Sequence, residues 1–421
     1  MSFAADTFAG ERFAVVGLGR NGLPVARALD AMGADIVAWD DSAVARDAAI
    51  GLHVAKPDFE RIDALILSPG IPHSLPAPHP MAAAAIAAGV PILSDAELLF
   101  RAVRKSGSKA KFVGITGTNG KSTTTALTTH ILAESGVYVA AGGNLGTPSL
   151  ALAPQATVYV LEMSSYMLER LATVRFDVAV MLNLSPDHLD RHGDMAGYAA
   201  AKRQIFARQE PDHTAVIGID DEPSRAMADW LRGRPIPVVT ISGTGDASAI
   251  LRGAHNGQNA AAAAAVCRAL GLDDAAIARG IASFKGLAHR QELVATIDGV
   301  AFVNDSKATN ADSAARALKS FPRVAWIAGG IAKAGGIESL APLFGHVAHA
   351  VLIGRDAQML AGTLAHHGVS HEIAGTMDVA VRAAARIGET VLLSPACASF
   401  DQFSGFEARG DAFRAAVRAL K

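Results

Sequence analysis

An apolar segment that runs into a glycine-rich loop and then into Lys-Ser constrains this chain more than any other feature. The segment is VGITGTNGKSTT, at Val113–Thr124. It predicts a strand over Lys111–Ile115 and a helix that begins near Lys121. Between them, Gly117 and Gly120 allow a turn tight enough to aim several backbone N–H groups at one anion. The chain must therefore contain a strand–loop–helix unit of the α/β type.

The residues of this loop are those of a phosphate-binding site. Lys121 supplies a mobile cation for the outer phosphates of a nucleotide, and the Ser122 hydroxyl can ligate Mg²⁺. The strict pattern G-x-x-x-x-G-K-[ST] is missed by one residue, because Ile115 stands where the first glycine is expected. The alternative is a glycine turn without a ligand. Gly-Lys-Ser at a helix start after a strand favours the phosphate site.

Length and composition restrict the fold class and the partners. A chain of 421 residues suggests two or three domains. Lys and Arg number 38 against 40 Asp and Glu, so the charge balance indicates neither nucleic acid nor an anionic membrane as a partner. Cys267 and Cys397 provide no disulfide framework. With no signal peptide at the N-terminus and alanine-rich runs too short to span a bilayer, we expect a cytoplasmic protein.

Strands and helices alternate along three blocks, which predicts an α/β protein with mostly parallel sheets covered by helices. Polar linkers are expected at Lys105–Lys109 and Phe284–His289. Helices are expected at Gly22–Gly33 and Met81–Val90. Besides the strand before the phosphate loop, the expected strands are Arg12–Val16, Asp35–Trp39, Ala64–Leu67, Val158–Leu161, Val178–Leu182, Val300–Val303, Val324–Ala328, Ala350–Ile353 and Val391–Leu393.

A second glycine-rich turn, GLGRNG at Gly17–Gly22, also follows a predicted strand and opens a helix. Asp40 ends the next strand at about the spacing of a ribose contact, which is typical of a dinucleotide-binding fingerprint. The underlying physics is less specific, because a helix N-terminus without side chains holds any pyrophosphate. NAD(P), another nucleotide such as a nucleoside-diphosphate sugar, and a purely structural turn all remain open on these residues.

Several polar residues of the middle block follow its predicted strands, where open α/β sheets bind their ligands. Singly, each has a simpler explanation as a turn cap, a solvated charge, a packed histidine or a surface lysine. Together they suit a metal–ATP complex: Glu162 and Ser122 offer the oxygen ligands that Mg²⁺ prefers, whereas His188 is a less typical ligand. The residues are Asn144, Glu162, Asn183, His188 and, on a helix, Lys202.

Eight short motifs are distributed along almost the whole chain. They are GTNGKST (Gly117–Thr123), GGNLGTP (Gly142–Pro148), LEMSSYMLE (Leu161–Glu169), NLSPDHLDRHG (Asn183–Gly193), HNGQNAAAA (His255–Ala263), His289-Arg290, NDSKATN (Asn304–Asn310) and SPACASFDQFSGFEARGDAF (Ser394–Phe413). In this order they resemble the Mur ligases, the ATP-dependent amide-forming enzymes of peptidoglycan precursor synthesis. The last motif is most similar to the members that add D-glutamate, rather than L-alanine, a diamino acid or a dipeptide.

The resemblance implies an activity and a domain plan. The activity is the addition of D-glutamate to UDP-N-acetylmuramoyl-L-alanine through an acyl phosphate, with ATP and two Mg²⁺ ions, in a cytoplasmic monomer. The plan is a Rossmann-like N-terminal domain at 1–106 that binds the UDP-substrate, a central P-loop mononucleotide-binding domain at 107–286 that binds ATP, and a C-terminal Rossmann-like domain at 287–421 that binds the amino acid and acts as a lid.

The resemblance also assigns roles to individual residues. The UDP-substrate would contact Gly17, Leu18, Gly19, Asp40, Asp41, Ser42, Ser68, Gly70, Asn144 and His188. ATP would contact Gly117, Thr118, Asn119, Gly120, Lys121, Ser122, Thr123, Asn256, Asn259, Arg290 and Asp305. The amino acid would contact Lys307, Thr309, Lys333, Ser399 and Phe406. The catalytic residues would be Lys121, Glu162, His188 and Lys202, and the metal ligands Ser122, Glu162, His188 and Lys202.

Lys202 matches a lysine that the family carbamylates on its amine. A neutral amine and CO₂ form an anionic carbamate, which is a hard oxygen ligand for a second Mg²⁺ ion. This chemistry requires surroundings that lower the pKa of the lysine.

Three other functions compete with the ligase. The hypothesis of an NAD-dependent oxidoreductase depends on Gly17–Gly22 and does not explain the phosphate loop. A nucleotide-binding module without catalysis would release no phosphate when given D-glutamate and the UDP-substrate. A ligase of the folate-polyglutamate type is the closest alternative, and the C-terminal motif disfavours it.

Overall fold

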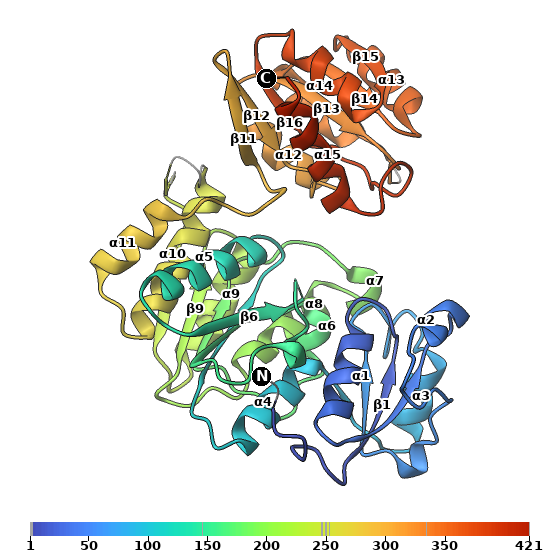
Figure 1. The fold of residues 1–421 in the computed structure, drawn as a ribbon. Coiled ribbons are helices and arrows are strands. Elements are labelled where there is room, and N and C mark those ends of the chain that lie inside the picture. Colours follow the sequence, from blue (N-terminus) through green and yellow to red (C-terminus); the bar gives the residue numbers. More distant parts are fainter. Residues whose placement is uncertain are drawn as a thin grey trace. The chain divides into compact units, whose positions relative to one another are not determined.

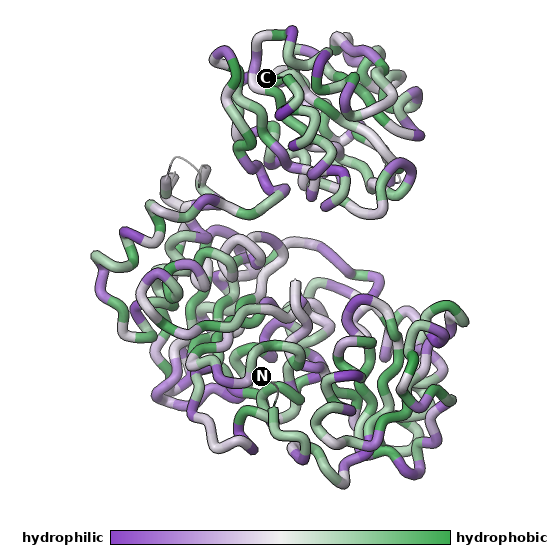
Figure 2. Tube along the Cα trace, in the orientation of Figure 1, coloured by the Kyte–Doolittle hydropathy of each residue, from purple (hydrophilic) through white to green (hydrophobic). Residues whose placement is uncertain are grey.

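The computed structural model describes residues 3–144, 146–245, 247–248, 251, 253–333 and 335–420. The chain forms two compact units, Met1–Phe284 and Lys285–Lys421. The first unit contains two sheets and the second contains one, each accompanied by helices (Figure 1). Figure 2 shows that the tube is largely apolar along the strands inside each unit and polar in many outer loops. Among the described helices, none combines the length and the apolar character needed to cross a bilayer.

The first sheet has the strand order β2-β1-β3-β4, and its neighbours run parallel. The three strands expected here are confirmed at their predicted bounds. Both expected helices are confirmed but end earlier, since Gly33 and Gly89 adopt the left-handed conformation that stops a helix. The elements are β1 (Arg12–Val16), α1 (Gly22–Ala31), β2 (Asp35–Trp39), α2 (Ala43–Asp47), β3 (Ala64–Leu67), α3 (Pro80–Ala87), β4 (Ile92–Leu93) and α4 (Asp95–Lys105).

The second sheet is also parallel and has the order β10-β9-β8-β5-β7-β6. The chain passes from β7 on one side of β5 to β8 on the other, so the carboxyl ends of three strands surround the loop that follows β5. Open α/β sheets bind ligands at such a point. The strands are β5 (Lys111–Thr116), β6 (Val139–Gly143), β7 (Val158–Glu162), β8 (Val178–Met181), β9 (Thr214–Gly218) and β10 (Val238–Ile241).

Helices cover both faces of the second sheet (Figure 1). Helix α10 packs against α5 and contributes an alanine-rich run, of which Ala262 and Ala263 are fully inaccessible. The helices are α5 (Lys121–Glu134), α6 (Ser165–Leu168), α7 (Leu189–His192), α8 (Met195–Arg203), α9 (Glu222–Arg232), α10 (Ala254–Ala269) and α11 (Asp274–Ser283).

The third sheet fills the second unit and has the order β11-β12-β16-β13-β14-β15. Within the described residues, β11 with β12 is the single antiparallel strand pair. The elements are β11 (Glu292–Ile297), β12 (Val300–Asn304), α12 (Ala311–Lys319), β13 (Val324–Gly329), β14 (Val347–Ile353), α13 (Ala357–His366), β15 (His371–Gly375), α14 (Met377–Ala385), β16 (Thr390–Leu393) and α15 (Phe406–Arg418). The boundary between the two units falls at the start of the predicted linker Phe284–His289.

A buried carboxylate on α4 binds this helix to the segment that precedes β8 of the second sheet. The Glu97 side chain is fully buried. It accepts hydrogen bonds from the backbone N–H groups of Ala172 (2.9 Å), Thr173 (2.9 Å) and Val174 (3.1 Å), and it pairs with Arg101 (2.9 Å). Burial by itself raises the pKa of Glu97, but the hydrogen bonds from Thr173 and its neighbours bring this pKa below its ordinary value.

We expect Glu97→Ala to lower the free energy of unfolding by about 3 kcal/mol, because the substitution leaves buried N–H donors without an acceptor. Urea denaturation followed by circular dichroism measures the loss. Glu134→Ala, at an exposed position of α5, is the matched control and should change stability by less than about 0.5 kcal/mol. Equal, small losses in both variants would contradict the anchoring role of Glu97.

Candidate active site

Two glycines shape the loop between β5 and α5. Gly120 has a φ of 85°, in the left-handed region, and a Cβ atom there would lie 2.3 Å from Oδ1 of Asn259. Gly117 has a φ of 150°, and its Cβ atom would lie 3.0 Å from the Leu182 side chain. Both positions therefore require glycine, and the turn brings the chain directly into the first turn of α5.

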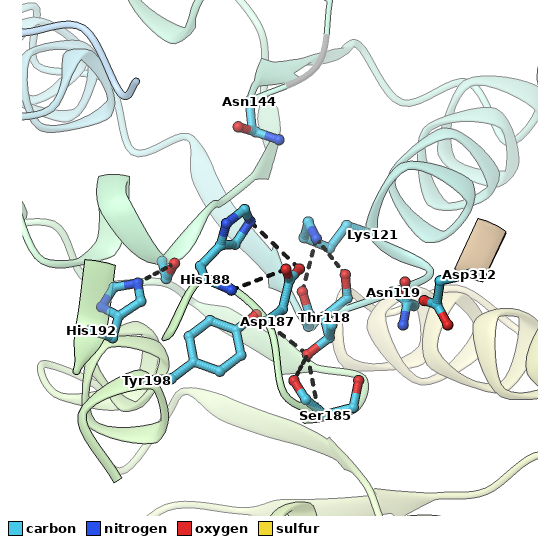
Figure 3. Close-up of polar contacts among 12 residues, drawn as sticks. Thr118, Asn119, Lys121, Asn144, Ser185, Asp187, His188, His192, Tyr198 and Asp312 are labelled. Carbon is cyan, nitrogen blue, oxygen red and sulfur yellow. Dashed lines mark hydrogen bonds and ion pairs between the residues drawn. The ribbon is translucent and has the colours of Figure 1, made fainter. Parts of the chain in front are cut away.

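The same loop is held from the carboxyl end of β8. The Asn119 N–H donates to Asn183 Oδ1 (2.9 Å), while Asn183 Nδ2 donates back to the Asn119 carbonyl (3.2 Å). The Thr118 N–H donates to the Asn183 carbonyl (2.9 Å), and the Thr118 hydroxyl accepts from the Ser185 N–H (3.0 Å; Figure 3). These contacts fix the loop before any ligand binds, so its N–H groups need little rearrangement to bind an anion.

The Lys121 side chain lies over this loop. Its Nζ donates to the carbonyl oxygens of Gly117 (2.9 Å) and Thr118 (3.0 Å; Figure 3). Ser122 follows in the first turn of α5 and is buried. A cation and a hydroxyl thus lie at the positive end of a 14-residue helix, where phosphate groups are stabilised.

A buried carboxylate lies on the neighbouring strand. Glu162 ends β7, in register with Ile115 of β5, and is 2% exposed. Its Oε1 accepts from Asn144 Nδ2 (2.8 Å), whereas its Oε2 is buried and has no hydrogen-bond partner among the described residues. A buried carboxylate oxygen without a partner is costly, and it is the kind of ligand that Mg²⁺ prefers. The donor set of Glu162 and Ser122 therefore fits a magnesium ion.

Lys202, on α8, points its amine at the start of the phosphate loop. The residue is 1% exposed, and Nζ donates to Thr116 Oγ1 (3.2 Å) and to the Gly117 carbonyl (3.0 Å). Nζ also lies 4.8 Å from the ring centre of Tyr198. Burial, and then the positive charge of Lys121, lower the pKa of Lys202 well below its ordinary value. This shift favours the neutral, nucleophilic form of the amine over its charged form.

His188 lies between β8 and α7 in the left-handed conformation, with a φ of 53°. Its Nε2 is 3.5 Å from Asp187 Oδ2 (Figure 3), and its ring centre is 5.2 Å from that of Tyr166. About half of its side chain is exposed, unlike Glu162 and Lys202. The structure thus leaves the His188 ring accessible to a ligand on the same edge of the sheet.

A cavity of about 610 Å³ opens beside the first sheet. It brings together most of the residues predicted to contact the UDP-substrate, including Asn144 from the second sheet. Leu18, Ser42 and His188 are not among its lining residues. The predicted residues that line it are Gly17, Gly19, Asp40, Asp41, Ser68, Gly70 and Asn144.

The acidic residues of this cavity are engaged with protein groups. Asp40 accepts backbone hydrogen bonds from Leu18 (2.6 Å) and Ser42 (2.8 Å), so the carboxylate that the fingerprint assigns to a ribose also holds the glycine turn. Asp41 Oδ2 is 3.0 Å from His79 Nε2, and this hydrogen bond lowers the pKa of Asp41. Because both oxygens of Asp40 already accept hydrogen bonds from the backbone, this carboxylate does not favour the dinucleotide interpretation.

His73 follows the loop that lines the cavity. Burial first, and then the charge of Arg170, lower the pKa of His73 to about 4. Between pH 6.5 and this value the unfolded chain binds the proton that the folded chain does not, so His73 destabilises the fold as the pH falls through this range.

His73→Gln should weaken this pH dependence. Between pH 7 and pH 5 we expect the variant to lose about 1 kcal/mol less of its free energy of unfolding than the wild type, a value reduced for the partial exposure of the ring. Urea denaturation at the two pH values measures the difference. His53→Gln, at an exposed position, should keep the wild-type dependence. An identical loss in His73→Gln and wild type would show that the ring does not resist protonation.

In the second unit, the residues predicted to contact ATP are Arg290 and Asp305, and Asp305 is buried. Asp305 accepts from Ser394 Oγ (2.8 Å) and from the Gln291 N–H (3.2 Å), next to Arg290. Burial raises the pKa of Asp305 to about 7. Asp305, at the carboxyl end of β12, thus lies beside the segment that carries Arg290.

The residues predicted to bind the amino acid lie on neighbouring segments of the same unit. Lys307 Nζ is 4.7 Å from the Phe406 ring centre, and the Thr309 N–H donates to the Lys307 carbonyl (2.9 Å). Backbone hydrogen bonds between Ile331 and Ala398 (2.9 Å) place the segment before Lys333 beside the segment before Ser399. Lys307, Thr309 and Phe406 thus lie together, and the segments that lead to Lys333 and Ser399 lie side by side.

Sequence reasoning missed two residues that contact the lysine amine. Thr116 accepts from Lys202, and the Tyr198 ring lies beside it. Tyr198 is four residues before Lys202 on a helix, so the two share a face, and this spacing was the available signal. Thr116 carried no comparable signal, because its contact joins residues 86 positions apart.

Two models of known protein families match this chain. The family model described as Mur ligase middle domain matches residues 115–251, and the model described as Mur ligase, glutamate ligase domain matches residues 289–397.

Relatives match over nearly the full length. The UDP-N-acetylmuramoylalanine–D-glutamate ligase of Paramagnetospirillum magneticum is 47% identical, and the match covers 98% of this chain and 97% of the relative. The enzyme of the same name from Sphingopyxis alaskensis is also 47% identical, with 98% of each chain covered. Among solved structures, the UDP-N-acetylmuramate-alanine ligase MurC of Thermotoga maritima has a TM-score of 0.61 and 18% identity, and the match covers 98% of this chain and 100% of that chain. At this identity the likeness concerns the fold alone, and it confirms the predicted α/β class.

Proposed function

Because the chain belongs to the Mur ligase family, we propose that it joins D-glutamate to UDP-N-acetylmuramoyl-L-alanine in an ATP-dependent step of peptidoglycan precursor synthesis. One observation carries the ATP-dependent chemistry. Strand β5, which leads into the phosphate loop and Lys121, pairs with β7, which ends at Glu162, and the buried Glu162 Oε2 has no partner among the described residues. The names of the relatives support the choice of substrates.

In this reaction the L-alanyl carboxylate takes the γ-phosphoryl group of ATP, and the amine of glutamate then displaces phosphate from the acyl phosphate. Activation is needed because a carboxylate has no leaving group that an amine can displace at neutral pH. Lys121 and the N–H groups of the loop offset the charge that builds on the phosphoryl oxygens, which is a mainly electrostatic task. The site must also exclude water, since acyl phosphates hydrolyse.

Glu162, Ser122 and His188 would hold one Mg²⁺ ion in this proposal, and Lys202, as its carbamate, would help to hold a second. Mg²⁺ supplies positive charge to the phosphate oxygens. The buried Glu162 Oε2 supports the first ion. The depressed pKa of Lys202 supports the second, because only a neutral amine adds CO₂.

The remaining predicted residues divide between the other substrates. The 610 Å³ cavity would take the UDP portion of the acceptor, with Asn144 near the end that reacts. Asn256 and Asn259 would face the adenine side of ATP, and Arg290 and Asp305 would add to its site. Lys307, Thr309, Lys333, Ser399 and Phe406 would bind glutamate. A monomer located in the cytoplasm completes the proposal, and the two free buried cysteines fit a reducing compartment.

An assay of phosphate release tests the function. Purified protein is given ATP, Mg²⁺ and UDP-N-acetylmuramoyl-L-alanine, with candidate amino acids added one by one and the product identified by mass. We expect release that depends on the acceptor and is fastest with D-glutamate. Release with L-glutamate and a folate acceptor instead would identify a folate-polyglutamate ligase, and oxidation of NADH would identify an oxidoreductase. Either result would overturn the proposal.

A further inference from the structure

One buried arginine, in the segment between α6 and β8, binds the loop that follows β3 and lines the 610 Å³ cavity. Arg170 is 3% exposed. One terminal nitrogen donates to the Leu67 carbonyl (2.8 Å) and, at 3.3 Å, to the Ser68 carbonyl, and the other donates to the Ile71 carbonyl (2.7 Å). Its side chain therefore spans both ends of the loop Ser68–Ile71.

A guanidinium suits this task better than an ammonium. Its N–H groups form a rigid planar fork, so one side chain reaches carbonyls on two sides of the loop. A terminal nitrogen of Arg170 also lies 3.2 Å from His73 Nδ1. The lowered pKa of His73 keeps its ring neutral and able to accept a hydrogen bond. The loop is fastened in turn to the glycine turn of the cavity, since Ser68 Oγ donates to the Gly17 carbonyl (2.7 Å).

The position of Arg170 in the chain connects this loop to the phosphate site. Arg170 lies eight residues after Glu162, at the other end of the segment that contains α6. The preceding residue, Glu169, pairs with His192 Nδ1 (3.2 Å), and the His192 ring lies 5.3 Å from the Tyr198 ring. The Tyr198 hydroxyl is 3.3 Å from Thr118 Oγ1 in the phosphate loop (Figure 3). A continuous series of contacts thus joins the two loops.

We propose that Arg170 is a positioning residue for the UDP-bearing substrate. It sets the shape of the loop Ser68–Ile71 and holds this loop in a fixed relation to Glu162, and it acts through Ser68 and Gly70. Arg170 itself is not among the residues that line the cavity, whereas Ser68 and Gly70 are. This inference rests on the proposed function, in which the cavity takes the UDP portion of the acceptor.

Steady-state kinetics of Arg170→Met test the proposal. The variant removes the fork and keeps most of the side-chain volume. We expect the KM for UDP-N-acetylmuramoyl-L-alanine to rise about tenfold or more, while kcat and the KM for ATP stay within about twofold, because the lost interaction is one of uniform binding. Arg175→Met is the matched control, since Arg175 forms an exposed ion pair with Glu210, and its kinetics should match the wild type.

Hydrogen exchange gives a readout that does not depend on activity. In Arg170→Met we expect faster amide exchange in residues 68–73 and wild-type exchange in residues 117–124. Arg170→Lys keeps the charge without the fork and should fall between wild type and Arg170→Met in both KM and exchange, which covers the case in which the methionine variant folds poorly.

Several results would overturn the inference. They are an unchanged KM for the UDP-substrate, unchanged exchange in residues 68–73, or a loss confined to kcat. A wild-type enzyme that does not turn over UDP-N-acetylmuramoyl-L-alanine would refute the proposed function instead. The exchange comparison would then still decide whether Arg170 holds the loop.

Discussion

Lys121→Ala is expected to lower kcat about 1,000-fold or more while leaving the affinity for the UDP-substrate within about twofold. The ammonium lies over the phosphate loop and is bound to the carbonyls of Gly117 and Thr118. Its removal takes away the positive charge that would offset the negative charge on the oxygens of the transferred phosphoryl group. The cavity proposed for the UDP portion is lined by other residues. Phosphate release measures the first effect, and calorimetric titration with the UDP-substrate measures the second.

Lys111→Ala is the matched control for this experiment. Lys111 begins the same strand, is about half exposed and pairs with Asp177 (2.6 Å). It should keep wild-type kcat. Circular dichroism of Lys121→Ala must show a folded protein, because the lysine also bonds to the loop. A near-wild-type rate in folded Lys121→Ala would refute the assignment of this loop to ATP.

The parallel strands of the fold could be predicted from the sequence because their hydrophobic pattern is continuous. Buried on both faces, β1 and β3 appear as unbroken apolar runs, and their predicted bounds are confirmed. β11 was not predicted, because it pairs antiparallel with β12 and is mostly half-exposed, so it lacks an apolar run. β4 contains two residues, too few for any periodicity to be visible.

The candidate site divides in the same way between local and distant interactions. The phosphate loop depends on glycines and a lysine within a few positions, so its sequence indicated its geometry. The contacts of Arg170 with the loop after β3 join residues about 100 positions apart, for example Leu67 and Arg170, and no local pattern reports them. Glu97, which binds backbone N–H groups around Thr173, was missed for the same reason. Asp40 shows the reverse case, in which a pattern suggested a ligand contact and the structure adds two backbone partners.

Lys202→Ala is expected to lower kcat at least 100-fold and to regain part of this activity when short-chain carboxylic acids are added. If Lys202 is carbamylated, the variant loses an anionic oxygen ligand of the second metal ion, and a small carboxylate that enters the space left by the side chain replaces it. The surroundings favour carbamylation, since burial and the nearby charge of Lys121 depress the pKa of this amine. Phosphate release with and without added acid measures both effects.

Two comparisons separate carbamylation from a role for the positive charge of Lys202. Lys202→Arg keeps a cation but offers no amine that adds CO₂, so it should be as inactive as Lys202→Ala and, because the guanidinium fills the space, should not respond to acids. Lys319→Ala, at an exposed position of α12, should show wild-type activity and no response. Activity retained in Lys202→Arg, or a Lys202→Ala enzyme that no acid restores, would contradict the carbamate. The amine would then serve through its hydrogen bonds to Thr116 and Gly117, which hold the start of the phosphate loop in place.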